Sequence, residues 1–124
     1  MSAMDHVKLA RSIAAGRVLF GALMLFVPNT VLARASADRP GPLIWLARAF
    51  GIRDVVLGVG ALRSLSAPEP DPSWVRMGAV ADTSDAIAAI AWRSELGPSG
   101  TVATLSLAVP AAAGGWIATS GMSR

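Results

Sequence analysis

The stretch WVRMGAVADTSDAIAAIAW, residues 74–92, decides how this chain folds. It has the length and the small apolar side chains of a membrane-spanning helix, yet Asp82 and Asp85 stand near its middle. A spacing of i, i+4, i+7 and i+11 puts four residues in one stripe along a helix: Gly78, Asp82, Asp85 and Ala89. We expect both carboxylates to face neighbouring helices, because a charge at the centre of a bilayer costs about 2.5–3.5 kcal/mol.

Three further segments share this length and apolar character: 9–27, 43–62 and 101–119. Proline-containing turns separate the segments, at Pro28-Asn29, Pro40-Gly41-Pro42, residues 68–72 and Gly97-Pro98. About twenty helical residues, at a rise of about 1.5 Å each, match a hydrocarbon layer about 30 Å thick. The sequence therefore predicts one domain, residues 1–124, folded as an all-α integral membrane antiparallel four-helix bundle.

Two helix details can also be predicted from the prolines. Asp71 or Ser73 is placed to cap the third segment, with Pro72 in its first turn. Pro110 predicts a kink in the fourth segment, because proline removes a helical hydrogen bond.

The composition supports a membrane protein and excludes several kinds of site. Hydrophobic residues make up 53% of the chain, charged residues 15%, and the mean hydropathy is +0.53. The absence of cysteine excludes thiolate chemistry and cysteine-based metal sites, and the single histidine, His6, lies far from the segment centres. The net charge is +3, but the basic residues are scattered without aromatic interleaving, so no nucleic-acid partner is predicted. No cofactor and no metal are predicted.

The second segment repeats the pattern of the third. Ala47, Gly51, Asp54, Gly58 and Ala61 form a stripe of small residues that contains one aspartate, and such stripes let helices approach closely in lipid. The first and second segments also resemble each other weakly. Ala10-Arg11 precedes Arg17 and Gly21, and Ala47-Arg48 precedes Arg53 and Gly58, which is suggestive of a duplicated helix.

Antiparallel segments would bring five charged residues into one central layer: Arg17, Arg53, Asp54, Asp82 and Asp85. With two cations and three anions, one carboxyl is expected to be protonated or to share a proton with a neighbour. Such a group suits acid–base catalysis or proton-coupled transport. The same pairs can instead serve only packing or assembly. Arg48 and Arg76 lie nearer the helix ends and are expected to extend to lipid headgroups.

The ends of the segments suggest an orientation. Trp45 and Trp92 mark one interface, and Trp74 and Trp116 mark the other. Five basic residues (Lys8, Arg11, Arg63, Arg76, Arg124) oppose three (Arg34, Arg39, Arg93), which favours cytoplasmic termini in the inner membrane of a bacterium. A cleaved leader ending at Ala35-Ser36-Ala37 is the alternative for the first segment.

The run Arg48-Ala-Phe-Gly-Ile-Arg53-Asp54-Val-Val-Leu-Gly58, with residues 78–85, resembles a group of uncharacterised actinobacterial four-helix membrane proteins. This group is distantly similar to the DoxX-like superfamily. The four-segment layout extends the resemblance over most of the chain, but the motifs occupy only the middle two segments. The resemblance implies an antiparallel four-helix membrane bundle linked to quinone, redox or lipophilic-metabolite chemistry, and it transfers no catalytic residues.

The leading functional hypothesis is a small membrane enzyme that holds a lipophilic molecule against the charged layer. Asp82 and Asp85 would handle the proton, Arg53 and Arg17 would orient or polarise the substrate, and Asp54 would support them. Epoxide opening, isomerisation or cyclisation needs no cofactor beyond such groups. An accessory subunit of a larger membrane complex and a proton-coupled exporter, acting as a homo-oligomer, remain alternatives. Small multidrug transporters carry a glutamate in their first helix, where this chain has Arg17.

Overall fold

A computed structural model describes residues 1–33 and 40–122 of the chain. Within these residues the regular structure is helical and contains no strand. The helices are α1 (Ala3–Phe26), α2 (Pro28–Leu32), α3 (Gly41–Leu65), α4 (Ser73–Ala91) and α5 (Arg93–Ser120). The all-α prediction is confirmed for the described part of the chain, and each expected segment corresponds to one long helix. The short α2 was not expected. Outside the described residues lie Arg34, Arg39 and Arg124, which bear on the predicted orientation, and Ala35-Ser36-Ala37 of the alternative leader.

The first helix begins earlier than expected, at Ala3 instead of near residue 9. Its start is fixed by a capping box: the Asp5 backbone N–H donates to the Ser2 hydroxyl, and the Ser2 N–H donates to the Asp5 carboxylate at 3.0 Å. The helix ends at Phe26, just before Pro28, as the sequence indicated. Pro28 then begins α2, a position that proline favours.

The caps of α4 and α5 differ in detail from the predictions. Pro72 precedes α4 instead of entering its first turn, and the Asp71 carboxylate accepts hydrogen bonds from the backbone N–H and the hydroxyl of Ser73. Asp71 therefore does part of the expected capping. In α5 the helical geometry is interrupted at Gly97, whose φ of 79° is one that glycine adopts readily. Pro98 follows, and the continuous part of the helix runs on from there.

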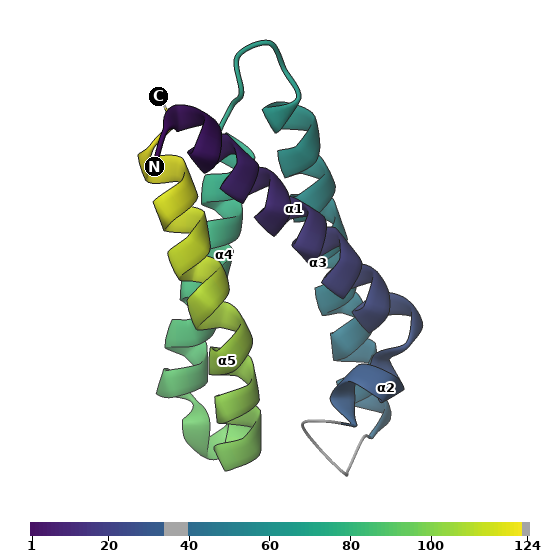
Figure 1. Cartoon of the computed structure of the whole chain (residues 1–124). Coiled ribbons are helices and arrows are strands. Elements are labelled where there is room, and N and C mark those ends of the chain that lie inside the picture. Colours follow the sequence, from purple (N-terminus) through teal and green to yellow (C-terminus); the bar gives the residue numbers. More distant parts are fainter. Residues whose placement is uncertain (34–39, 123–124) are drawn as a thin grey trace.

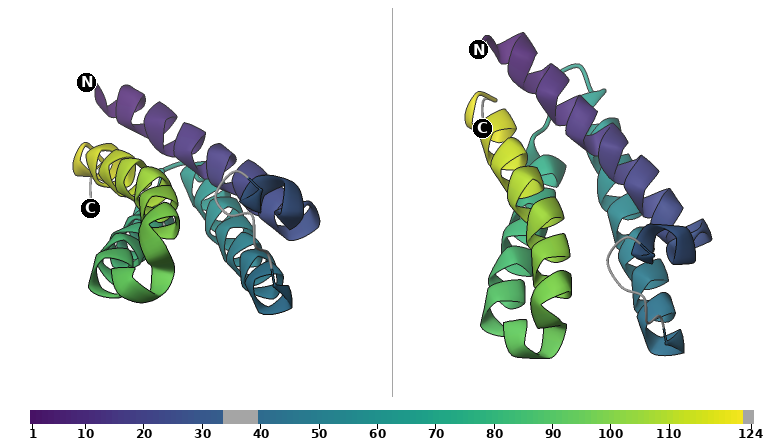
Figure 2. Two further views of the ribbon diagram at one scale, coloured as in Figure 1. Left: turned by 90° about the horizontal axis from the view of Figure 1, so that it is seen from below. Right: turned by 60° about the horizontal axis from the view of Figure 1, so that its bottom comes forward.

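The long helices pack as two antiparallel pairs, α1 with α3 and α4 with α5 (Figure 1). At the end that carries the amino terminus, all four helices share an apolar core: Ala10, Ala14, Ala61, Leu65, Val75, Ala118 and Met122. Toward the end that carries α2 the two pairs diverge, and both views in Figure 2 show the same separation. Apolar packing therefore joins the two helix pairs at one end, and the pairs separate toward the other.

Large apolar side chains cover the outside of the bundle. Each long helix exposes several, among them Leu19 and Phe26, Ile52 and Val56, Val80, Ile87 and Ile90, and Val102 and Leu107. The expectation that Val80, Ile87 and Ile90 point away from the aspartate stripe is confirmed. By length and composition, α1 and α5 are the described helices that could cross a membrane. Every stretch of 18 residues in α3 or α4 contains at least three charged residues, whereas residues 9–26 of α1 contain two, so α3 and α4 are less apolar over the length of a span.

Candidate functional site

Small residues bring α1 and α3 into backbone contact. A Cβ atom added to Gly51 would lie 2.5 Å from the Gly21 carbonyl oxygen, and one added to Gly58 would lie 2.8 Å from the Ala14 carbonyl oxygen. All five members of the small-residue stripe of α3 are buried. The prediction that this stripe is a close helix–helix contact is therefore confirmed.

The α1–α3 pair has an approximate twofold symmetry that explains the internal similarity. When the sequence is aligned with itself at a shift of 37 residues, Ala10-Arg11 and Gly21 match Ala47-Arg48 and Gly58 (47 − 10 = 58 − 21 = 37). The same shift carries Arg17 onto Asp54, and these two side chains bind each other, with Arg17 Nη1 3.0 Å from Asp54 Oδ1. An ion pair therefore stands at the centre of the symmetric contact.

The symmetry extends to the helix ends. Arg11 donates to the Leu65 carbonyl oxygen at the end of α3, and Arg48 donates to the Leu25 carbonyl oxygen at the end of α1. Each arginine thus satisfies a carbonyl that a helix terminus leaves without a partner. Arg48 is exposed, and its guanidinium binds this carbonyl, so its expected contact with lipid headgroups stays a prediction.

Arg17 is the centre of a buried ionic triad formed by Arg17, Asp54 and Asp82. Its Nη1 donates to Asp54 Oδ1 at 3.0 Å and to Asp82 Oδ1 at 3.2 Å, and its Nη2 donates to Asp82 Oδ2. The three side chains are 9%, 8% and 7% exposed. Gly78 makes room for the guanidinium, since a Cβ at that position would lie 2.9 Å from Arg17 Nη2. The triad joins α1, α3 and α4.

A second pair, Arg53 with Asp85, lies beside this triad and is more open. Arg53 donates from Nη1 to Asp85 Oδ1 at 3.3 Å and from Nη2 to Asp85 Oδ2 at 2.6 Å, which is a bidentate arrangement. The Arg53 guanidinium also lies 4.3 Å from the centre of the Phe50 ring. The Arg53 and Asp85 side chains are 36% and 25% exposed. Arg53 Nη2 is 3.9 Å from Asp54 Oδ1, so the pair and the triad form one network.

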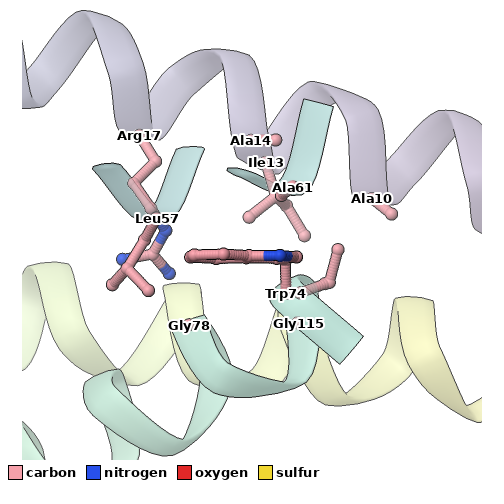
Figure 3. A pocket seen from close by; sticks show the side chains of 10 residues that line it. Ala10, Ile13, Ala14, Arg17, Leu57, Ala61, Trp74, Gly78 and Gly115 are labelled. Carbon is pink, nitrogen blue, oxygen red and sulfur yellow. The ribbon is translucent and has the colours of Figure 1, made fainter. Parts of the chain in front are cut away.

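The five charged residues predicted to meet are thus brought together, but in two environments. Two contacts of the network, Arg17–Asp82 and Arg53–Asp85, cross from one helix pair to the other. The triad is surrounded by side chains, and the cavity beside Arg17 has a volume of only about 10 Å³, about the space that one water molecule needs. Figure 3 shows the Trp74 ring next to the Arg17 guanidinium, with Ala10 and Ala14 on one side and Gly78 on the other.

A much larger groove, of about 530 Å³, opens where the two helix pairs diverge. It is lined by Phe50 of α3, by Asp85, Ala88 and Ala89 of α4, and by Trp92, Glu95, Leu96 and Thr104 around the following turn and α5. Of the three aspartates in the network, Asp85 is the one that lines this groove. In the groove, the apolar side chains of Phe50, Trp92 and Leu96 therefore accompany Asp85, the most exposed aspartate of the charged network.

Several residues of the site were not assigned by the sequence analysis. Phe50 and Glu95 were not singled out, and Trp92 was assigned to an interface. Thr104 was a candidate, with Thr83, Ser84 and Thr101, for a hydrogen bond between helices or for the site. Trp74 was also expected at an interface, but its ring packs against Gly60, between the helix pairs. Only the divergence of the pairs reveals this groove, and no residue pattern encodes that divergence.

Neither the comparisons with known proteins nor the positions of possible metal ligands assign a function to this site. No family model, no curated protein and no solved structure matches this chain. The resemblance to DoxX-like proteins therefore stays a prediction. Among the described residues, no group of His, Asp and Glu side chains is arranged to hold a metal ion.

Proposed function

We propose that the chain is a multi-pass protein of a bacterial cytoplasmic membrane, in which α1, α3, α4 and α5 form an antiparallel four-helix bundle. The distribution of side chains supports this: charged groups gather inside, while large apolar residues cover the outside of every long helix. Water would favour the opposite distribution. The first three of these helices contain 24, 25 and 19 residues, and α5 has 23 residues beyond the interruption at Gly97 (120 − 98 + 1 = 23), so each is about 28–38 Å long at about 1.5 Å per residue, close to the thickness of the hydrocarbon layer or somewhat longer.

Within this bundle, we propose that the groove binds a lipophilic molecule whose polar group contacts the Arg53–Asp85 pair. The observation that carries the proposal is the difference between the aspartates. Asp85 is 25% exposed and lines a groove of about 530 Å³, whereas Asp54 and Asp82 are 8% and 7% exposed and are held by Arg17. An ionisable residue at this depth that faces open space is typical of a functional site.

The chemistry we propose is proton transfer between Asp85 and the bound molecule, without a cofactor. Asp85 would act as the general base or acid, and Arg53 would orient the carboxylate and polarise an oxygen atom of the substrate. Isomerisation, cyclisation or epoxide opening fits these groups. The triad of Arg17, Asp54 and Asp82 would hold α1, α3 and α4 in place. Asp82, which the sequence paired with Asp85, thus takes a positioning role.

The test uses the protein in nanodiscs of bacterial lipid, incubated with lipophilic metabolites extracted from bacterial membranes. Mass spectrometry would compare the wild type with Asp85→Asn and with Glu69→Gln, a matched change at an exposed loop carboxylate. We expect a metabolite to be converted by the wild type and by Glu69→Gln but not by Asp85→Asn, with helicity unchanged in all three. Conversion by Asp85→Asn at the wild-type rate would refute the catalytic role of Asp85.

A further inference from the structure

One hydroxyl in the groove lacks the partner that its neighbours have. Over residues 78–91 and 100–120, the Ser and Thr hydroxyls generally donate to a carbonyl of their own helix, as those of Thr83, Ser84, Thr101, Ser106, Thr119 and Ser120 do. Thr104 is the exception: no described residue accepts its hydroxyl, and Thr104 lines the groove. A hydroxyl that stays free in an apolar groove is available to a ligand.

The position of Thr104 along the groove follows from the α4–α5 pairing. A Cβ atom on Gly115 would lie 3.0 Å from Ala79 Cβ, so these positions stand opposite each other. Counting back along two antiparallel helices places Thr104 at the level of Ile90, five residues beyond Asp85 (115 − 104 = 90 − 79 = 11). At about 1.5 Å per residue, Asp85 and Thr104 are therefore about 7.5 Å apart along the groove.

The charge at the inner end of the groove restricts what can bind there. Asp85 already holds Arg53 in a bidentate pair, and the Arg17 triad lies immediately behind it. Arg53 and Asp85 neutralise each other, while the triad has one cation for two carboxylates and Glu95 also lines the groove, so an anionic ligand would add a further uncompensated negative charge at membrane depth, which is strongly unfavourable. A hydroxyl or carbonyl oxygen can share hydrogen bonds with the pair without this cost.

We propose that the ligand is a lipophile without a negative charge that carries two oxygen groups about 7.5 Å apart along its length. One group binds the Arg53–Asp85 pair, and the other binds the Thr104 hydroxyl. This assignment rests on the proposed function, because it names the class of molecule that would occupy the same groove. Thr104 is then a specificity-determining residue.

The experiment measures saturable quenching of Trp92, which lines the groove, by bromine-terminated alkyl probes in nanodiscs. The probes share one chain length and differ in the polar group: a primary alcohol, a diol with hydroxyls on the first and sixth carbons, and a sulfate. A Trp92→Phe variant identifies the quenching that comes from the groove. We expect the diol to bind about threefold to tenfold more tightly than the alcohol, as one added hydrogen bond implies. The sulfate probe should bind at least about tenfold more weakly than the alcohol.

The variant Thr104→Val should abolish the advantage of the diol, and Thr101→Val, which removes a hydroxyl bonded to its own helix, should preserve it. Binding of the sulfate probe as tight as that of the alcohol, or tighter, would overturn the inference, as would a diol advantage that survives in Thr104→Val. If no probe gives saturable quenching that depends on Trp92, the groove itself is not a binding site and the proposed function fails as well.

Discussion

Replacing Arg17 by methionine removes the cation of the triad while keeping much of the side-chain volume. Arg17 donates three hydrogen bonds to two carboxylates that are 8% and 7% exposed. Without it, Asp82 loses its cation, and Asp54 retains only Arg53 at 3.9 Å. Removing one partner of a buried ion pair costs about 3–5 kcal/mol, so we expect the free energy of unfolding to fall by that amount.

The measurement is the helical circular dichroism of the protein during a titration of mixed micelles with a denaturing detergent. The matched control is Arg63→Met, since Arg63 is exposed at the end of α3, and its change should be below about 0.5 kcal/mol. A variant that combines Arg17→Met with Asp54→Asn and Asp82→Asn removes the stranded charges and should recover about half of the loss or more. A decrease in the free energy of unfolding below about 1 kcal/mol for Arg17→Met alone is what an exposed ion pair gives. It would refute the view that the triad is a buried ionic contact that stabilises the packing of α1, α3 and α4.

Three further substitutions test the packing around the network. Gly51→Ala should lower the free energy of unfolding by about 1–3 kcal/mol in the same titration, because its Cβ would lie 2.5 Å from the α1 backbone; Gly16→Ala, which meets nothing within 4 Å, should leave stability unchanged or raise it by up to about 1 kcal/mol. A comparable loss in both variants would contradict the proposed close contact. Arg48→Gln should cost about 0.5–1.5 kcal/mol and increase hydrogen exchange in the last turn of α1, whose carbonyl it binds; unchanged exchange would exclude the capping role. Trp74→Ala should cost about 3–5 kcal/mol because the ring fills the space between the helix pairs, and a cost below about 1 kcal/mol would place the ring outside the core.

The sequence predicted the helices and the meeting of the charged residues because local periodicity determines both. The glycine and aspartate stripes identify the buried faces of α3 and α4, and the prolines mark where helices stop. Antiparallel connectivity then places Arg17, Asp54 and Asp82 at one level.

Other features depend on how whole helices are placed relative to one another. Arg48 reaches the end of α1 only because the α1–α3 contact is nearly symmetric, and Trp74 enters the core only because Gly60 leaves room for its ring. The groove beside Asp85 requires the two helix pairs to diverge. No single-helix pattern encodes the angle between pairs, so the different exposures of Asp82 and Asp85 could not be predicted.

The most direct test asks whether the outside of the bundle faces lipid at the depth of the charged layer. The chain has no cysteine, so single cysteines can carry a spin label at Val56 and Ile87, exposed positions two residues beyond Asp54 and Asp85. In nanodiscs, the account predicts that both labels are relaxed strongly by oxygen and weakly by a water-soluble nickel chelate, while a label at Glu69 in the loop shows the opposite. Strong relaxation by the nickel chelate at Val56 and Ile87 would contradict a charged layer enclosed within a membrane.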